Sequence, residues 1–279
     1  RLIAAAVLGG ALSVSGFLLQ TFFRNPIAGP FVLGISSGAK MVLGLVMIFL
    51  LKYIQPVPVW LTMVSAFIGS LLTLMLVLLF AKKMASMSML LVVGIMIGYI
   101  CSAVTDFCIT FASDADITNL THWSQGSFSS ISWQSLLYAS VIIGIAFLLT
   151  FLLSKPLGAY QLGEGYAKSL GLNIKRFRIV IILLSSLLSA TVTALSGPIS
   201  FVGIAVPHIT RIMLKSTKPI IMVPAAFLCG SVFCMFCDLI ARTLFSPTEL
   251  AIGTVTAAFG APIVIWLMVS NKKKGGSAS

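Results

Sequence analysis

Residues 2–22 read LIAAAVLGGALSVSGFLLQTF, a stretch of apolar and small residues without a single charged side chain. An α-helix rises about 1.5 Å per residue and a bilayer core is about 30 Å thick, so this stretch can cross a membrane once. Inside lipid the backbone must pair within its own segment, which favours a helix. Strands of a membrane barrel are shorter and alternate in polarity. The stretch therefore predicts a transmembrane helix in an all-α membrane protein.

The same character extends along the chain. Of its 279 residues, 59% are hydrophobic and only 9% are charged, and the mean hydropathy is +1.11. Soluble globular proteins carry roughly 25% charged residues, so this composition excludes a soluble enzyme, a nucleic-acid-binding domain and a disordered chain. The sequence predicts nine spans in a polytopic helical bundle, and the short seventh span is expected to be broken or tilted. The nine run approximately over residues 2–22, 31–51, 57–81, 87–112, 132–154, 178–198, 200–214, 219–244 and 250–270.

Positive charge is concentrated in alternate loops between these spans. One set of loops holds 14 of the 18 lysines and arginines, and short loops rich in these residues lie on the cytoplasmic side of a membrane. Most of the acidic residues lie on the opposite side. Arg1 is therefore predicted outside and Lys274 inside, which requires an odd number of crossings and agrees with nine. The net charge of +12 is thus explained by topology, and no nucleic acid partner is needed.

Two connections are longer than the rest. The outer loop, residues 113–131, is polar and carries Trp123. The inner segment, residues 155–177, has moderate helical character, with Tyr166 and Leu170 on an apolar face. Such an amphipathic segment can lie among lipid headgroups or dock a soluble partner, and its composition fits both possibilities.

Three short motifs have a structural and a chemical interpretation. GISSG at 34–38 matches G-x-S-x-G, but a protease would need a base within reach of Ser36, and small residues also let membrane helices pack closely. Cys234 and Cys237 form a C-x-x-C without further ligands nearby, which favours packing over metal binding. We favour packing for both motifs. No stretch has the spacing of a phosphate-binding loop, so the chain is not expected to hydrolyse ATP by itself.

Charged residues inside membrane spans are costly and often functional. Asp238 and Arg242 are four residues apart, so they share a helix face and can pair. The alternative is that Asp238 couples transport to protons together with Asp106. Because both acids lie near the outer ends of their spans, we favour the structural pair. Lys40 also lies within a span, where it can meet an anionic ligand or extend its ammonium group to an interface.

The segment RLIAAAVLGGALSVSGFLLQTFFRNPIAGPFVLGISSGA (1–39) resembles the FecCD-type permeases of bacterial importers for iron–siderophores, haem and vitamin B12. The resemblance implies a type II ABC importer permease fold. It implies one permease domain over residues 1–270, with a cytoplasmic coupling segment at 157–177 and a cytoplasmic tail at 271–279. Family members have ten helices, so the chain is expected to lack the first. The resemblance continues, in the family's order, through HWSQGSFSSISW (122–133), LGEGYAKSLGL (162–172), SGPISFVGIAVPHITR (196–211) and ELAIGTVTAAFGAPIVIWL (249–267).

The resemblance also implies partners. A second permease, either another copy or a related chain, completes the path through the bacterial cytoplasmic membrane. Two cytoplasmic ABC ATPases bind ATP and Mg²⁺, and an external binding protein delivers an iron–siderophore, haem or a cobamide. The chain itself is expected to bind no cofactor or metal and to be no enzyme. The rival interpretation is a proton-coupled secondary transporter that uses Asp106 and Asp238.

Matching positions of the family motifs suggest roles for individual residues. Two outer arginines, Arg1 and Arg242, are expected to dock the binding protein. The turn NPIAGP and the start of the fourth span are expected to form a cytoplasmic gate, with Asn25, Ile27, Met87 and Ser88 as its residues. Contact with the ATPase is assigned to Leu162, Gly163, Glu164, Ala167, Leu170 and Gly171.

Overall fold

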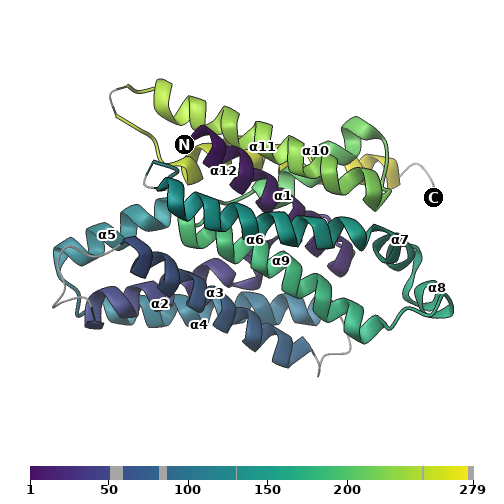
Figure 1. The fold of residues 1–279 in the computed structure, drawn as a ribbon, viewed down its shortest axis with the longest axis horizontal. Coiled ribbons are helices and arrows are strands. Elements are labelled where there is room, and N and C mark those ends of the chain that lie inside the picture. Colours follow the sequence, from purple (N-terminus) through teal and green to yellow (C-terminus); the bar gives the residue numbers. More distant parts are fainter. Residues whose placement is uncertain (51–58, 82–86, 130, 247, 276–279) are drawn as a thin grey trace.

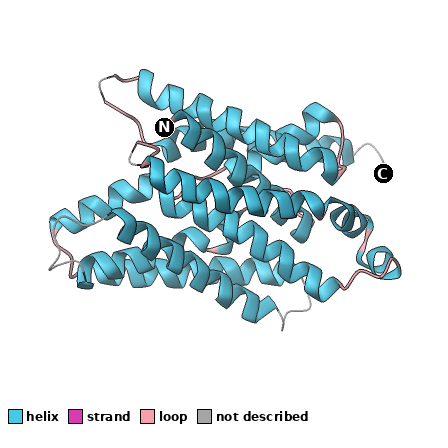
Figure 2. Cartoon of the chain, in the orientation of Figure 1, coloured by secondary structure: helices cyan, strands magenta, loops and turns pink. Residues whose placement is uncertain are grey.

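The computed structural model describes residues 1–50, 59–81, 87–129, 131–246 and 248–275. Figure 2 shows that the described residues form helices joined by loops, without a strand among them. The predicted all-α fold class is therefore confirmed. Two of the expected gate residues, Met87 and Ser88, begin a helix, but their side chains lie outside the described part of the structure.

Among the described residues, six helices are long and apolar enough to cross a membrane, and three shorter apolar helices occupy the places of the other predicted spans. The short helix α10 (Val202–Leu214) is the irregular seventh segment that the sequence predicts. The other two are α2 (Ile35–Leu45), which continues into a π-helical turn at Val46–Leu50, and the apolar part Ile252–Ile265 of α12 (Ile252–Gly275). The six long helices are α1 (Leu2–Phe23), α3 (Val59–Ala81), α4 (Met87–Ile109), α6 (Trp133–Leu152), α9 (Ile174–Ser196) and α11 (Pro219–Thr243).

Four further elements lie between these helices. The 3₁₀ turn η1 (Pro30–Leu33) precedes α2, and the inner segment folds into α7 (Ser154–Leu162) and α8 (Glu164–Ser169). The outer loop, which sequence analysis treats only as a polar loop, contains α5 (Asp114–Gln125). Ser113 caps α5, because its Oγ accepts a hydrogen bond from the Asp116 amide at 3.3 Å.

Helix α1 is the centre of the bundle and packs against α9, α10 and α11 (Figure 1). Glycines make this packing close. A Cβ on Gly16 would lie 1.7 Å from the carbonyl oxygen of Gly203 in α10, and one on Gly9 would lie 2.5 Å from Cβ of Cys234 in α11. Helix α2 approaches α3 in the same way, because a Cβ on Gly69 would lie 2.2 Å from the carbonyl oxygen of Gly38. The packing interpretations of the GISSG and C-x-x-C motifs are therefore confirmed.

The irregularity of α10 has an identifiable cause and a specific partner. Pro207 has no N–H group, so the Gly203 carbonyl four residues earlier loses its helical donor. The side-chain amide of Gln20 in α1 takes that place. Its Nε2 donates to the Gly203 oxygen at 3.4 Å and to the Ile204 oxygen at 3.0 Å. A polar side chain on the central helix thus satisfies the carbonyl group that a proline frees inside the bundle.

Figure 1 shows how the ends of the bundle are arranged. The N-terminus, where Arg1 lies, is at the same end as α5, whereas α7 and α8 lie at the opposite end. Acidic Asp114 and Asp116 begin α5 at the first end, and basic Lys168 lies on α8 at the second. The arrangement agrees with the topology that the charges predict, in which Arg1 and residues 162–172 face opposite sides of the membrane.

Candidate functional site

The α7–α8 segment has one buried side and one exposed apolar side. Ala167 is fully buried, whereas Leu162, Tyr166 and Leu170 are 73%, 51% and 61% exposed. Two glycines shape the connections. Gly163 ends α7 with φ 135° and Gly171 follows α8 with φ 83°, and residues with a Cβ atom rarely adopt such positive φ angles. The segment is thus held in a defined shape against the bundle while it presents apolar side chains outward.

Tyr160 of α7 anchors this segment to the core. Its ring is fully buried, and its hydroxyl lies 3.5 Å from the Phe22 carbonyl oxygen and 3.3 Å from Oε1 of Glu164. Arg24, at the end of α1, donates from Nη2 to the Tyr160 carbonyl oxygen at 3.2 Å. Arg178 of α9 lies 2.5 Å from the same Glu164 oxygen. Four residues therefore connect α8 with both α1 and α9.

The charges in this network reinforce each other. Burial alone would raise the pKa of Glu164, but the hydrogen bond and charge of Arg178 hold that pKa below its ordinary value. Burial raises the pKa of Tyr160, although Arg178 opposes the change. Glu164 is therefore ionised and Tyr160 neutral at pH 7, so the tyrosine hydroxyl donates and the carboxylate accepts.

Asn25 and Ile27, from the expected gate, lie in the turn directly after α1. Asn25 organises this turn, because its side-chain Oδ1 accepts from the Ile27 backbone N–H at 3.1 Å and its backbone N–H donates to the Gln20 carbonyl oxygen. Ile27 is 39% exposed. Since the neighbouring Arg24 bonds to Tyr160, the turn lies at the same end of the bundle as the α7–α8 segment. The gating role of these residues stays a prediction.

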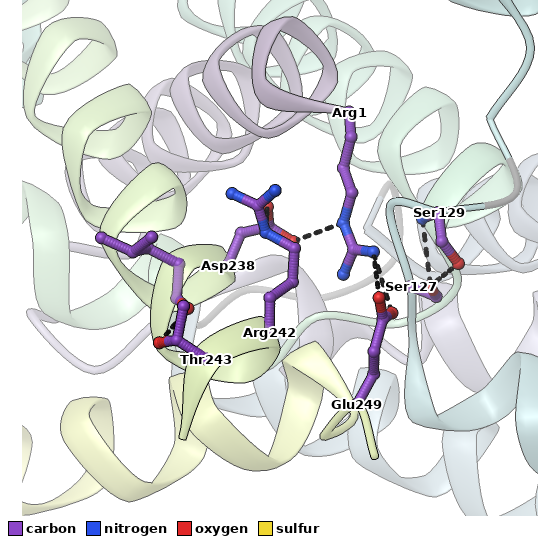
Figure 3. Close-up of polar contacts among 8 residues, drawn as sticks. Arg1, Ser127, Ser129, Asp238, Arg242, Thr243 and Glu249 are labelled. Atoms are coloured by element: carbon purple, nitrogen blue, oxygen red, sulfur yellow. Dashed lines mark hydrogen bonds and ion pairs between the residues drawn. The ribbon is translucent and has the colours of Figure 1, made fainter. Parts of the chain in front are cut away.

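At the other end, four charged residues form the cluster in Figure 3. Arg1 points between two carboxylates, with Nε 3.0 Å from Oδ1 of Asp238 and Nη1 2.8 Å from Oε2 of Glu249. Arg242 lies 3.3 Å from the other oxygen of Asp238. The structure therefore brings together both arginines of the expected docking site, and it adds two acids that compensate them.

This cluster decides the interpretation of Asp238. Its side chain is only 2% exposed and is shared between two guanidinium groups, so the structural pair of Asp238 and Arg242 is confirmed. Asp106, the other acid of the proton-coupling alternative, is exposed on α4. The contact between Arg1 and Glu249 could not be foreseen, because 248 sequence positions separate the two residues.

Histidine, cysteine and acidic side chains are dispersed among the described residues. Within them, no three histidine, cysteine or acidic side chains gather in a way that could hold a metal ion. All five cysteines are free thiols, and four of them are buried in the helical core. Cys234 and Cys237 belong to that core, as their packing interpretation requires.

Comparisons with known proteins agree with this geometry. A model of the FecCD transport family matches residues 1–270. The vitamin B12 import system permease protein BtuC of Vibrio cholerae is 38% identical over 272 residues, which cover 97% of this chain and 81% of that protein. The hemin transport system permease protein HmuU of Yersinia pestis is 34% identical over 275 residues, with coverage of 98% and 82%.

Solved structures show the same fold. An inward-facing structure, described as an ABC transporter of the metal-chelate type, superposes with a TM-score of 0.88 at 29% identity and covers 97% of this chain and 85% of its own. PsaBC from Streptococcus pneumoniae, in complex with a Fab, has a TM-score of 0.60 at 14% identity, with coverage of 95% and 88%, and shows the fold alone. The predicted fold of a type II ABC importer permease is confirmed.

Proposed function

Because this chain belongs to the FecCD transport family, we propose that it is the permease subunit of an ATP-driven importer in the bacterial cytoplasmic membrane. Its relatives are transport permeases rather than enzymes. The proposed cargo is a metal chelate, namely an iron–siderophore, haem or a cobamide, that an external binding protein delivers. The names of the relatives, which refer to vitamin B12 and hemin, support this class of cargo.

The α7–α8 segment carries the proposal. Exposed Leu162, Tyr166 and Leu170 offer an apolar contact for a cytoplasmic ATPase, and this favours docking over burial in headgroups. The ATPase binds ATP and Mg²⁺, and its closure on nucleotide moves α8. Glu164 passes that movement to α9 through Arg178 and to α1 through Tyr160. Because α1 is the central helix, a displacement there reaches α10 and α11 as well.

The same movement is proposed to control the gate. Arg24 ties the turn that holds Asn25 and Ile27 to Tyr160, so α7 and this turn shift together. Ile27 is exposed and can close a narrow passage between two permeases, whether the second is another copy or a related chain. Helix packing through glycines gives the bundle discrete arrangements rather than gradual deformation.

The outer cluster is the proposed docking site for the binding protein. Arg242 forms one ion pair among the described residues and its side chain is 38% exposed, so its guanidinium can also reach an acidic partner. Arg1 is 21% exposed and holds two carboxylates of its own chain. We therefore assign direct recognition mainly to Arg242, with Arg1 as the residue that positions the cluster.

The test is uptake by proteoliposomes that contain the permease, its ATPases and its binding protein. We expect chelate uptake to require ATP and to continue when an ionophore collapses the proton gradient. Uptake that stops with the gradient at constant ATP would support the proton-coupled alternative. Cysteine crosslinking from Leu170→Cys to the ATPase tests the docking surface separately, and a matched Leu137→Cys variant on exposed α6 should give no crosslink.

A further inference from the structure

A cavity of about 550 Å³ lies where four parts of the chain converge. Its wall comes from the region around the start of α2, the end of α5, the connection between α9 and α10, and the start of α12. Ser36 and Lys40 are four residues apart on α2, so they share the helix face that lines the cavity. The wall includes Ser36, Lys40, Gln125, Gly253, Thr254 and Ala257.

The polar groups of this wall are open to a ligand. Ser36 is 8% exposed, and no hydrogen bond joins its hydroxyl to any described residue. The hydroxyl oxygen itself is accessible from the cavity, so it can donate a hydrogen bond to a bound group. Gln125 and Thr254 lie at the exposed part of the wall, with donors that can reach the same space. The cavity wall thus carries a hydroxyl donor from the largely buried Ser36 and further donors from the more exposed Gln125 and Thr254.

The electrostatics of the cavity favour an anion. Lys40 has no ion pair within the described part of the chain, and none of the described residues in the lining is acidic. The first turns of two helices add to this field, because Ser36 lies in the first turn of α2 and Gly253 in that of α12. Backbone N–H groups in such turns carry partial positive charge.

We propose that this cavity binds an oxyanion, a carboxylate or phosphate group of the transported ligand. Lys40 supplies the counter-charge and the Ser36 hydroxyl donates a hydrogen bond. The lysine therefore meets an anionic ligand instead of extending to an interface. That the molecule bearing this anionic group is the transported ligand rests on the proposed function. The preference of the cavity for anions over cations does not depend on it.

The first experiment measures that selectivity without any cargo. In the complete transporter, an Ala257→Cys variant places a thiol in the cavity wall, and protein without this variant gives the background from native cysteines. Labelling rates are measured with an anionic sulfonatoethyl and a cationic trimethylammonium-ethyl methanethiosulfonate. We expect the anionic-to-cationic rate ratio to fall about fivefold to tenfold when Lys40→Gln is added, because one nearby charge acts oppositely on the two reagents.

Matched variants keep this result interpretable. Lys40→Arg should preserve the ratio, and Lys215→Gln, which removes the same charge at the far end of α10, should leave it unchanged. Lys40→Met repeats the neutral change with an apolar side chain of similar length if the glutamine variant does not fold. An unchanged ratio in a folded neutral variant overturns the proposal.

The second experiment separates the two sources of oxyanion. Labelling by neutral methyl methanethiosulfonate is measured in citrate, phosphate or chloride at equal ionic strength. We expect at least one oxyanion to slow labelling about twofold or more relative to chloride, and only while Lys40 is present. Protection by citrate alone assigns a carboxylate, and protection by phosphate alone assigns a phosphate. If neither oxyanion slows labelling, the proposal is overturned. A failure of ATP-driven uptake does not affect the labelling rates and contradicts only the proposed function.

Discussion

Glu164 of α8 and Arg178 of α9 form an ion pair of 2.5 Å in the connection that joins the inner segment to the bundle. The carboxylate also accepts from Tyr160, whose hydroxyl reaches the end of α1. One acidic side chain thus connects three helices. We therefore propose that Glu164 transmits movement of α8, and that exposed Leu162 and Leu170 are the surface on which a partner ATPase imposes it.

Replacement of Glu164 by Gln should uncouple the transporter. The amide keeps the size of the carboxylate but loses the charge-assisted hydrogen bond to Arg178, which is worth roughly twice a neutral one. We expect ATP hydrolysis to persist while cargo uptake per ATP falls about threefold to tenfold, measured in proteoliposomes.

The charge swap controls for local damage to α8. A double variant, Glu164→Arg with Arg178→Glu, restores an ion pair in reverse and should recover part of the coupling. Normal coupling in Glu164→Gln would contradict the transmission role, as would a swap that is no better than its single variants.

The pKa of Glu164 predicts a pH dependence with a definite sign. Since the folded-state pKa is below its ordinary value of about 4.3, the ionised carboxylate stabilises the fold fully above that ordinary value. The contribution is lost as the pH falls through the lower folded-state pKa. The difference in Tm between the native chain and Glu164→Gln should stay constant from about pH 8 to about pH 5 and vanish in stronger acid. A difference that already disappears near pH 6 would contradict this assignment.

Much of the fold could be predicted because it follows from local properties of the chain. The long apolar stretches specify their helices, and the placement of lysines and arginines specifies which ends share a side. The GISSG motif indicates close packing, and Gly38 indeed contacts α3. The pair of Asp238 and Arg242 follows from helical spacing alone.

What sequence analysis missed depends on less obvious signals. Helix α5 carries a capping signal, Ser113 followed three residues later by Asp116, but the polarity of the loop concealed it. The contacts between Arg1 and Glu249 and between Gln20 and Gly203 join distant positions, and no local pattern indicates them. The cavity around Lys40 is of the same kind, since four separate segments build it.

The glycine contact between α1 and α10 predicts a large effect of a single methyl group. In Gly16→Ala, the new Cβ would lie 1.7 Å from the Gly203 carbonyl oxygen, so the helices must separate. We expect a loss of about 1–3 kcal/mol in stability, measured as a lower Tm of the purified chain. Gly144→Ala in α6 is the matched control, because nothing lies within 4 Å of its new Cβ. Equal Tm values for both variants would contradict the packing.

Replacing the two arginines of the outer cluster should have different effects on docking and on Tm. Arg242→Gln should weaken docking of the binding protein with a smaller loss of stability than Arg1→Gln, because buried Asp238 keeps its shorter pair with Arg1, at 3.0 Å against 3.3 Å. Arg1→Gln should lower the Tm as well, since it releases both Asp238 and Glu249.

The docking defect of Arg242→Gln should be larger at about 50 mM salt than at about 500 mM, because salt screens exposed charges. Lys215→Gln, at the opposite end of the bundle, should change neither property. Docking by Arg242→Gln that equals the native chain at both salt concentrations would remove this arginine from the site.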